Sequence, residues 1–147
     1  MLRERIEQVE ERIAKACVRA GRKREEITLV AVTKKFSPQV MLEAYACGLR
    51  VFGENYVQEG LDKIAANRGH ALARDLVWHC IGPLQSNKTR AVAEHFHWVH
   101  SVDRLRIAQR LSEQRPAQLP PLQVCLQVNI DGGPTKSGVS PDQALVL

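Results

Sequence analysis

Lys34 is the side chain of this sequence best placed for covalent chemistry. It follows the apolar run from Ile27 to Val32, which has the composition of a strand buried on both faces. Ser37-Pro38, three residues further on, favours the start of a helix. A lysine between a strand and a helix lies where α/β proteins place their reactive groups. A desolvated amine there loses its charge more easily and can attack an aldehyde to form an imine.

The position of Lys34 is also compatible with a purely structural role. The aliphatic stem of a lysine packs against a strand end while its ammonium group reaches water. Position alone favours this structural interpretation, so chemistry at Lys34 needs support from the rest of the sequence.

Polar residues follow the other apolar runs as well. Parallel strands place their carboxyl ends at one edge of a sheet, where loops on a rigid core form ligand sites. Part of this pattern arises without any function, because strands end where polar residues begin. The polar residues are Glu54 and Asn55, His79 with the segment 85–88, Ser101 and Asp103, and then Asn129, Asp131 and Lys136.

The composition predicts one globular domain over residues 1–147. The chain has 147 residues, of which 44% are hydrophobic and 25% are charged, as in folded proteins with a sizeable core. No apolar segment reaches the length of a membrane span and the amino terminus is charged, so we expect no membrane association and no secretory signal. The four cysteines are widely separated among apolar residues, which predicts reduced, buried thiols in a cytoplasmic protein.

The net charge of +5 does not by itself indicate a nucleic-acid-binding protein. Basic residues cluster at positions 19–24 and 104–115, without aromatic residues between them. Nucleic-acid surfaces commonly combine basic and aromatic side chains. Solvated helix faces therefore explain the clusters better, and the positive charge also suits an anionic ligand such as a phosphate ester.

Hydrophobic periodicity predicts one preceding helix and then repeated strand–helix units. Apolar residues at steps of three and four form a stripe in the segment 1–21, and Gly21 favours the end of that helix. Strand-like runs begin near residues 27, 50, 76, 98 and 122. The helices predicted between and after them are 37–47, 57–66 with Leu61, Ile64 and Ala65 inward, 88–95, 103–114 with Asp103 as its cap, and a fifth from Ser140.

These units predict a parallel sheet, for which three architectures are open. A dinucleotide-binding fold needs a glycine-rich turn after its first strand, and Thr33-Lys34-Lys35-Phe36 contains no glycine. A leucine-rich solenoid needs a leucine spacing that is absent. A (β/α)8 barrel of the TIM type, with about 31 residues per unit, fits best. Residues 27–147 then form about the first five βα units of such a barrel.

Four segments carry motifs of a known protein family. They are residues 31–34, 52–59 with the sequence F-G-E-N-Y-V-Q-E, 78–88 with the sequence W-H-C-I-G-P-L-Q-S-N-K, and 136–138. The two longer motifs are too unusual to agree by chance. On these residues the chain resembles the pyridoxal phosphate homeostasis protein family, also called the proline synthase co-transcribed family, over nearly its whole length.

The resemblance implies a barrel similar to the alanine racemase N-terminal domain, with pyridoxal 5′-phosphate held as an imine, or Schiff base, on Lys34. Lys35 is expected to point to the opposite side of the strand. The family is regarded as lacking established catalysis and as buffering or delivering the cofactor. The implied partners are the cofactor and the enzymes that use it, without nucleic acid or membrane, and no catalytic residue is expected.

A pyridoxal-dependent racemase or decarboxylase is the alternative function. Such an enzyme needs a second acid–base residue on the other face of its substrate. Only Tyr45 and Tyr56 are available as tyrosines in this sequence.

Asn55 is the second predicted cofactor-binding residue, either as a donor to the ring oxygen or as a group that orients Lys34. A cap on the following helix is equally compatible with it. His79 suits a hydrogen-bonded core histidine better than an acid–base group. Residues 85–88 suit an anion contact or a helix cap, and Lys136 suits a second amine near the site or a surface residue.

No metal site is predicted. Glu94, His95 and His97 share no face, because a helix end runs into a strand between them.

The resemblance also implies later strands, whose loops supply the phosphate site. The sequence stops at Leu147, inside the fifth predicted helix. An open half barrel exposes strand edges and apolar surface. We therefore expect a polypeptide of this length to bind the cofactor weakly or to fold only by pairing with another chain.

Overall fold

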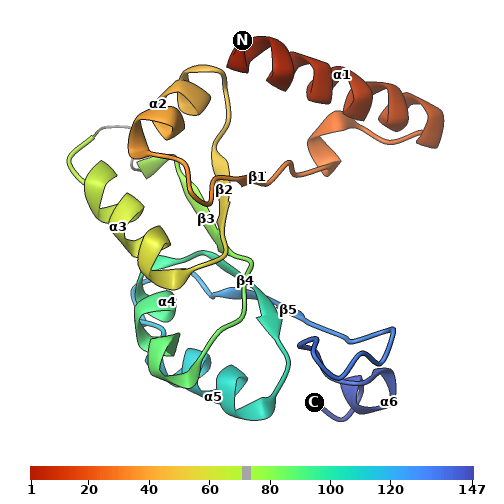
Figure 1. Ribbon diagram of the computed structural model, residues 1–147, viewed down its shortest axis with the longest axis vertical. Helices are drawn as coiled ribbons and strands as arrows, with labels where there is room; N and C mark the ends of the chain where they lie inside the picture. The colour runs from red at the N-terminus through yellow and green to blue at the C-terminus, as the bar shows by residue number, and fades with distance from the viewer. Residues whose placement is uncertain (71–73) are drawn as a thin grey trace.

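A five-stranded parallel sheet forms the centre of the computed structural model, which describes residues 1–70 and 74–147 (Figure 1). Each strand pairs with the next one along the chain, the order that successive strand–helix units produce in a barrel. The strands are β1 (Ala31–Val32), β2 (Val51–Glu54), β3 (Val77–Cys80), β4 (Trp98–Val102) and β5 (Gln123–Leu126).

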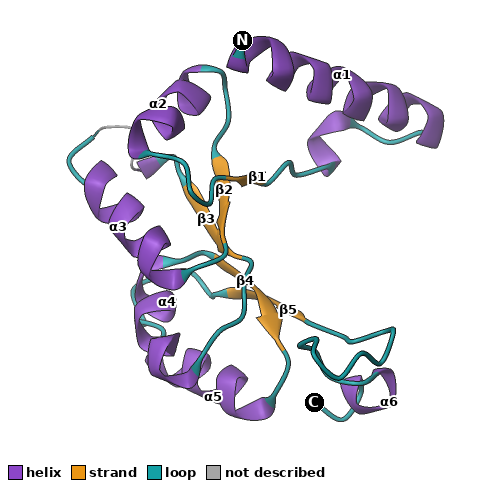
Figure 2. Ribbon diagram, viewed as in Figure 1, coloured by secondary structure: helices purple, strands orange, loops and turns teal. Residues whose placement is uncertain are grey.

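Helices α2 to α5 connect these strands and cover one side of the sheet, as Figure 2 shows. Two further helices, α1 and α6, precede and follow the sheet, and η1 and η3 are short 3-10 helices. The helices are α1 (Leu2–Ala20), η1 (Arg24–Glu26), α2 (Pro38–Ala46), α3 (Val57–Asn67), η3 (Ser86–Lys88), α4 (Thr89–His95), α5 (Leu105–Gln114) and α6 (Pro141–Ala144). The predicted α/β fold of about five βα units after a preceding helix is confirmed.

Local sequence signals set two of the helix ends as predicted. The hydroxyl of Ser37 accepts a hydrogen bond from the amide of Val40 at 3.4 Å, and Pro38 occupies the first turn of α2. Gly21 ends α1 in the left-handed conformation with a φ of 67°. The carboxylate of Glu10 pairs with Arg24 at 2.8 Å, which ties α1 to η1.

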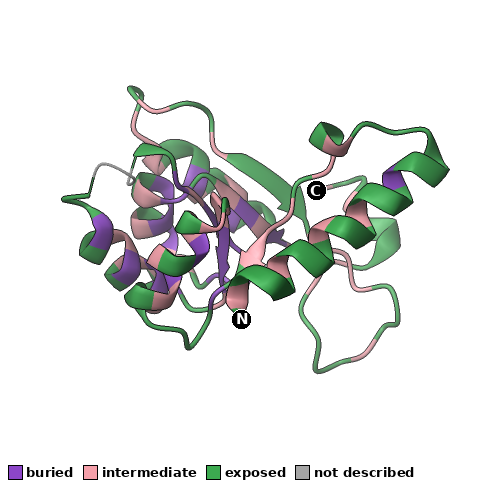
Figure 3. Ribbon diagram, turned by 90° about the horizontal axis from the view of Figure 1, so that it is seen from above, coloured by how far each residue is buried: buried purple, intermediate pink, exposed green. Residues whose placement is uncertain are grey.

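The core lies between the helices and the three central strands. Figure 3 shows the buried residues concentrated where the helices meet the sheet. The rings of Phe52 and Trp78 lie 5.9 Å apart on neighbouring strands. The other core residues that are almost inaccessible to solvent are Cys80, Val92, Ala93, Phe96, Val99, Val102 and Ile107.

The edge strands differ from what the sequence predicts. The expected strand over 27–32 is shortened to β1, and Val32 is 46% exposed instead of buried. The physical reason is that β1 pairs on one side only and helices cover only one face of the sheet. All of β5 is exposed for the same reason. The expectation of buried thiols therefore holds for Cys17 and Cys80, whereas Cys47 is partly buried and Cys125 is exposed.

The predicted cap of α5 is also wrong. Arg104 occupies the cap position and makes no side-chain cap bond. The carboxylate of Asp103 instead accepts a hydrogen bond from the amide of Gly138 at 3.2 Å. A tertiary contact has replaced the local one that the sequence favoured.

Candidate functional site

Lys34 is exposed in a tight turn directly after β1. The amide of Phe36 donates to the carbonyl of Thr33 at 3.1 Å, which closes a β-turn over residues 33–36. Lys35, the third residue of the turn, has a φ of 66°. This left-handed conformation costs a residue with a side chain about 1–2 kcal/mol, so the turn needs support from elsewhere in the fold.

The carboxyl ends of the first three strands lie level with one another. The amide of Thr33 donates to the carbonyl of Gly53 at 3.1 Å, and the amide of Ile81 donates to that of Glu54 at 3.0 Å. Gly82 packs so closely on Asn55 that a Cβ would lie 2.0 Å from the Asn55 carbonyl oxygen, which only glycine permits.

The structure therefore brings the two predicted cofactor-binding residues to one edge of the sheet. Lys34 follows β1 and Asn55 follows β2, and these two strands pair with each other in parallel. Parallel pairing places their carboxyl ends side by side.

A buried network of polar side chains lies beneath the Lys34 turn. Lys63 of α3 is 4% exposed and Glu54 of β2 is 1% exposed. The Lys63 ammonium donates to Glu54 at 2.7 Å and to Glu59 at 3.1 Å, and it also donates to the carbonyl of Thr33. The hydroxyl of Thr33 donates to the same Glu54 oxygen. A buried ion pair needs such additional hydrogen bonds to offset its desolvation.

Glu59 extends this network to the far side of the turn. Its carboxylate accepts a hydrogen bond from the backbone amide of Lys35. That hydrogen bond, followed by the one from Lys63, holds the pKa of Glu59 below its ordinary value. Glu59 is therefore ionised at neutral pH, where its charge strengthens both hydrogen bonds.

This network was not predicted from the sequence. The prediction that Leu61, Ile64 and Ala65 face inward is wrong in part, since Leu61 and Ile64 are only partly buried and Ala65 is exposed. A lysine on a helix is normally solvated. The spacing of Lys63 could have indicated its burial, because it lies on the same face of α3 as the other buried residues. The buried residues of α3 are Val57, Gly60, Lys63 and Asn67.

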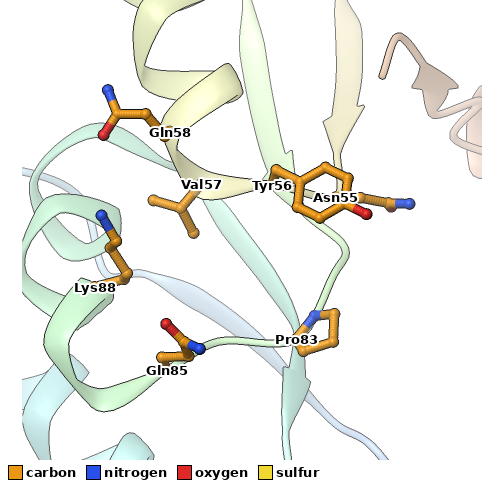
Figure 4. A pocket seen from close by; sticks show the side chains of 7 residues that line it. All are labelled: Asn55, Tyr56, Val57, Gln58, Pro83, Gln85 and Lys88. Carbon is orange, nitrogen blue, oxygen red and sulfur yellow. The ribbon is translucent and has the colours of Figure 1, made fainter. Parts of the chain in front are cut away.

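Asn55 lines a hollow of about 430 Å³ between the start of α3 and the loop after β3 (Figure 4). Lys34 does not line it. The interpretation of Asn55 as a helix cap is wrong, because Tyr56 occupies the cap position of α3 without a side-chain cap bond. The residues that line the hollow are Asn55, Tyr56, Val57, Gln58, Pro83, Gln85 and Lys88.

The polar segment 85–88 therefore contributes two side chains, Gln85 and Lys88, to this hollow. The alternative of a side-chain helix cap is wrong here too. Lys88 holds the cap position of α4 without a side-chain cap bond. The hydroxyl of Thr89 donates to the carbonyl of Ser86 at 2.9 Å instead.

His79 is a buried histidine with a partner, as predicted. It is 5% exposed, its Nδ1 lies 2.8 Å from Nε2 of His100, and its ring stacks on Trp98 with centroids 5.2 Å apart. Burial, with smaller contributions from His100 and His97, lowers the pKa of His79 to about 4. The ring is therefore neutral at pH 7.

The remaining candidates have other partners. Lys136 pairs with Asp131 at 2.7 Å in an exposed loop, which agrees with a surface residue. Nδ1 of His97 accepts a hydrogen bond from the amide of Trp78 at 2.9 Å. Among the described residues, no three His, Cys, Asp or Glu side chains are arranged to hold a metal ion. In the same part of the chain, no helix combines the length and apolar character needed to cross a membrane.

The parallel sheet, with polar residues at the carboxyl ends of its strands, is typical of a (β/α) barrel domain. The family model described as alanine racemase, N-terminal domain, matches residues 5–147, and the chain belongs to this family. It is 52% identical to the pyridoxal phosphate homeostasis protein of Vibrio cholerae, over 99% of this chain and 62% of that protein. It is 56% identical to the protein of the same name in Pseudomonas aeruginosa, over 98% of this chain and 61% of that one.

A solved structure supports the same relationship. PipY of Synechococcus elongatus, solved with PLP bound, is 39% identical and superposes with a TM-score of 0.72 over 91% of this chain and 59% of that chain. The resemblance to pyridoxal phosphate homeostasis proteins is thereby confirmed. This chain spans about 60% of the length of these relatives.

Proposed function

We propose that this chain binds pyridoxal 5′-phosphate through Lys34 and holds or delivers the cofactor without catalysing a reaction on it. One observation carries the proposal. Among the described residues, no ion pair or hydrogen bond engages the Lys34 ammonium, although the turn that bears it is anchored to β2 and α3. The relatives named for pyridoxal phosphate homeostasis and the PLP-bound PipY support the choice of ligand.

The chemistry of an exposed lysine suits reversible storage. Its neutral amine adds to the aldehyde carbon of the cofactor, and loss of one water molecule leaves a carbon–nitrogen double bond. Addition of water reverses the step and restores both the amine and the aldehyde. The same lysine can therefore retain the cofactor and release it to enzymes that use it, which we place in the cytoplasm.

Asn55 is our second proposed contact for the cofactor. It follows the strand next to Lys34, and its amide group can donate to the ring oxygen. In Figure 4 its carboxamide points away from Gln85 and Lys88. We assign the aldehyde and ring end of the cofactor to Lys34 and Asn55, and the net charge of +5 suits its phosphate.

The positions of the tyrosines argue against the alternative of a racemase or decarboxylase. The hydroxyl of Tyr45 donates to Asp75 at 2.8 Å, and its ring lies under Arg50, the residue before β2. Tyr45 therefore lies at the amino ends of the strands, opposite Lys34. Its hydrogen bond to Asp75 raises the pKa of Tyr45. Tyr56 is 64% exposed, where a proton-transferring group would not be shielded from water.

Reductive trapping tests the proposal. The chain is incubated with pyridoxal 5′-phosphate, reduced with borohydride and mapped by peptide mass spectrometry. We expect the label on Lys34. Pyridoxine 5′-phosphate, which has an alcohol in place of the aldehyde, serves as the control and should give no label. A label spread evenly over the exposed lysines would refute the proposed function.

A further inference from the structure

We infer that Glu59 and Lys63 position the turn after β1 so that Lys34, and not its neighbour Lys35, forms the imine. We call these two residues of α3 the α3 clamp. The inference rests on the proposed function, and it concerns which of two adjacent lysines is selected. Neither residue of the clamp touches the cofactor in this scheme, so both are positioning residues.

Two adjacent lysines present a problem of selectivity. Lys34 and Lys35 are both exposed, and each carries its amine on a flexible four-carbon stem. In a strand, successive side chains would point to opposite faces. Here both residues lie in a β-turn, after the end of β1, so strand alternation no longer separates them. Their directions depend on the conformation of the turn.

The α3 clamp holds both peptide groups next to Lys34. The Lys63 ammonium donates to the carbonyl of Thr33, which belongs to the peptide before Lys34. The carboxylate of Glu59 accepts from the amide of Lys35, which belongs to the peptide after Lys34. The turn is thus held from one helix on both sides of the residue that it presents.

The second of these contacts determines the type of turn. Among the described residues other than glycine, Lys35 alone has a positive φ. A positive φ at the third position of a β-turn is typical of a type II turn. Rotation of the peptide between Lys34 and Lys35 converts type II to type I, which any residue adopts without strain. That rotation would turn the Lys35 amide away from Glu59. The hydrogen bond to Glu59 therefore opposes the change that would redirect the Lys35 side chain.

The clamp is itself fixed by burial. Lys63 is 4% exposed and pairs with Glu54 at 2.7 Å, so its ammonium cannot move away from the turn without leaving a buried carboxylate unpaired. The side chain of Glu59 is more accessible, since 28% of it is exposed. Glu59 can therefore be changed with less disturbance of the core than Lys63.

Reductive trapping of Glu59 variants tests the inference. Glu59→Ala removes the acceptor of the Lys35 amide, whereas Glu59→Gln retains an oxygen that can accept it. Glu11→Ala is the matched control, because Glu11 forms an exposed pair with Lys15 one helical turn away, at 3.0 Å. Each protein is treated with limiting pyridoxal 5′-phosphate and borohydride, and the ratio of label on Lys34 to label on Lys35 is measured by fragmentation.

We expect the unchanged chain, Glu11→Ala and Glu59→Gln to carry the label mainly on Lys34. In Glu59→Ala the ratio should fall by about tenfold, as the loss of one hydrogen bond to a charged acceptor predicts. Lys63→Met should shift the ratio in the same direction where circular dichroism shows that it folds. A change in thermal stability alone does not alter this ratio.

An unchanged ratio in Glu59→Ala would overturn the role of the clamp and leave the proposed function intact. Absence of label from both lysines in the unchanged chain would overturn the proposed function itself, and the inference with it.

Discussion

β1 and β5 are the two edge strands of the sheet, and the segments that follow them are held in different ways. The turn after β1 is tied to Glu54 and Lys63, which are buried. The loop after β5 is held by exposed or partly buried groups, including the pair of Asp131 and Lys136 at 2.7 Å and the hydrogen bond from the Gly138 amide to Asp103. Breaking a buried ion pair costs about 3–5 kcal/mol, whereas an exposed pair contributes about 0–1 kcal/mol.

The turn after β1, which presents the proposed cofactor-binding lysine, depends on contacts from a helix. β1 has two residues and pairs only with β2, so the sheet alone provides little support for the turn that follows. Buried polar contacts from α3 supply that support. The β5 edge has no comparable network among the described residues, and its lysine is paired at the surface.

Breaking the buried pair of Lys63 and Glu54 should destabilise the protein most. We predict that Lys63→Met lowers the free energy of unfolding by about 3–5 kcal/mol, because Glu54 is left buried without its partner. Lys136→Met, the corresponding change at the β5 edge, should lower it by less than about 1 kcal/mol. Urea denaturation measures both values. Equal losses of stability in the two variants would show that the turn after β1 is held no more firmly than the loop after β5.

Gly82→Ala tests whether the strand ends are packed as closely as the structure indicates. The new Cβ would lie 2.0 Å from the carbonyl oxygen of Asn55. We predict a loss of about 1–3 kcal/mol, because the loops after β2 and β3 must move apart. Gly69→Ala is the control, since its Cβ would meet no atom within 4 Å. Melting curves that are the same for both variants would show that the strand ends are not in contact.

His79 on the central strand β3 should make the stability of the protein depend on pH. The pKa of His79 is lowered from 6.5 to about 4 in the folded protein. The unfolded chain therefore takes up the proton first, and stability should be full above about pH 6.5 and decline as the pH falls towards about 4. In His79→Gln the decline should be shallower. His70→Gln, at an exposed position, should follow the unchanged chain, and a His79→Gln curve with the original slope would exclude this histidine as the cause.

Relief of the backbone strain at Lys35 should change the stability least. Lys35→Gly should raise the free energy of unfolding by up to about 1 kcal/mol, because glycine adopts a positive φ without strain. Lys23→Gly is the control at an ordinary backbone conformation, with a φ of −80°. It should lower stability by about 0.5–1 kcal/mol through the greater entropy of the unfolded chain. A loss of stability in Lys35→Gly would show that the positive φ of Lys35 is not a source of strain.

Much of the fold could be predicted from the sequence because its signals are local. The apolar runs and the end signals at Gly21 and Ser37 predict five strands with helices between them, and the structure confirms these elements. The exposure of Val32 and Cys125 could not be predicted, because it depends on which strands lie at an edge. The cap at Asp103 was wrong because Gly138, distant in the sequence, takes its carboxylate.

The candidate site also contains residues that could be predicted from the sequence and residues that could not. Lys34 could be proposed from its place after a strand and from the motif around it. Lys63 could not, because a lysine is buried only when tertiary structure supplies partners for its charge. Glu59 lies one helical turn from Lys63, a spacing that the predicted helix already provides, whereas Glu54 lies on β2 and only the fold brings it to Lys63. The motif F-G-E-N-Y-V-Q-E contains both carboxylates but gives no indication that Glu54 shares this partner.

The assignment of Lys34 as the imine-forming residue is tested by comparing Lys34→Ala and Lys35→Gly with the unchanged chain after addition of pyridoxal 5′-phosphate. We predict that the yellow imine absorbance and the retained cofactor are lost in Lys34→Ala and are preserved in Lys35→Gly. Undiminished absorbance and cofactor binding in Lys34→Ala would contradict the assignment of this lysine.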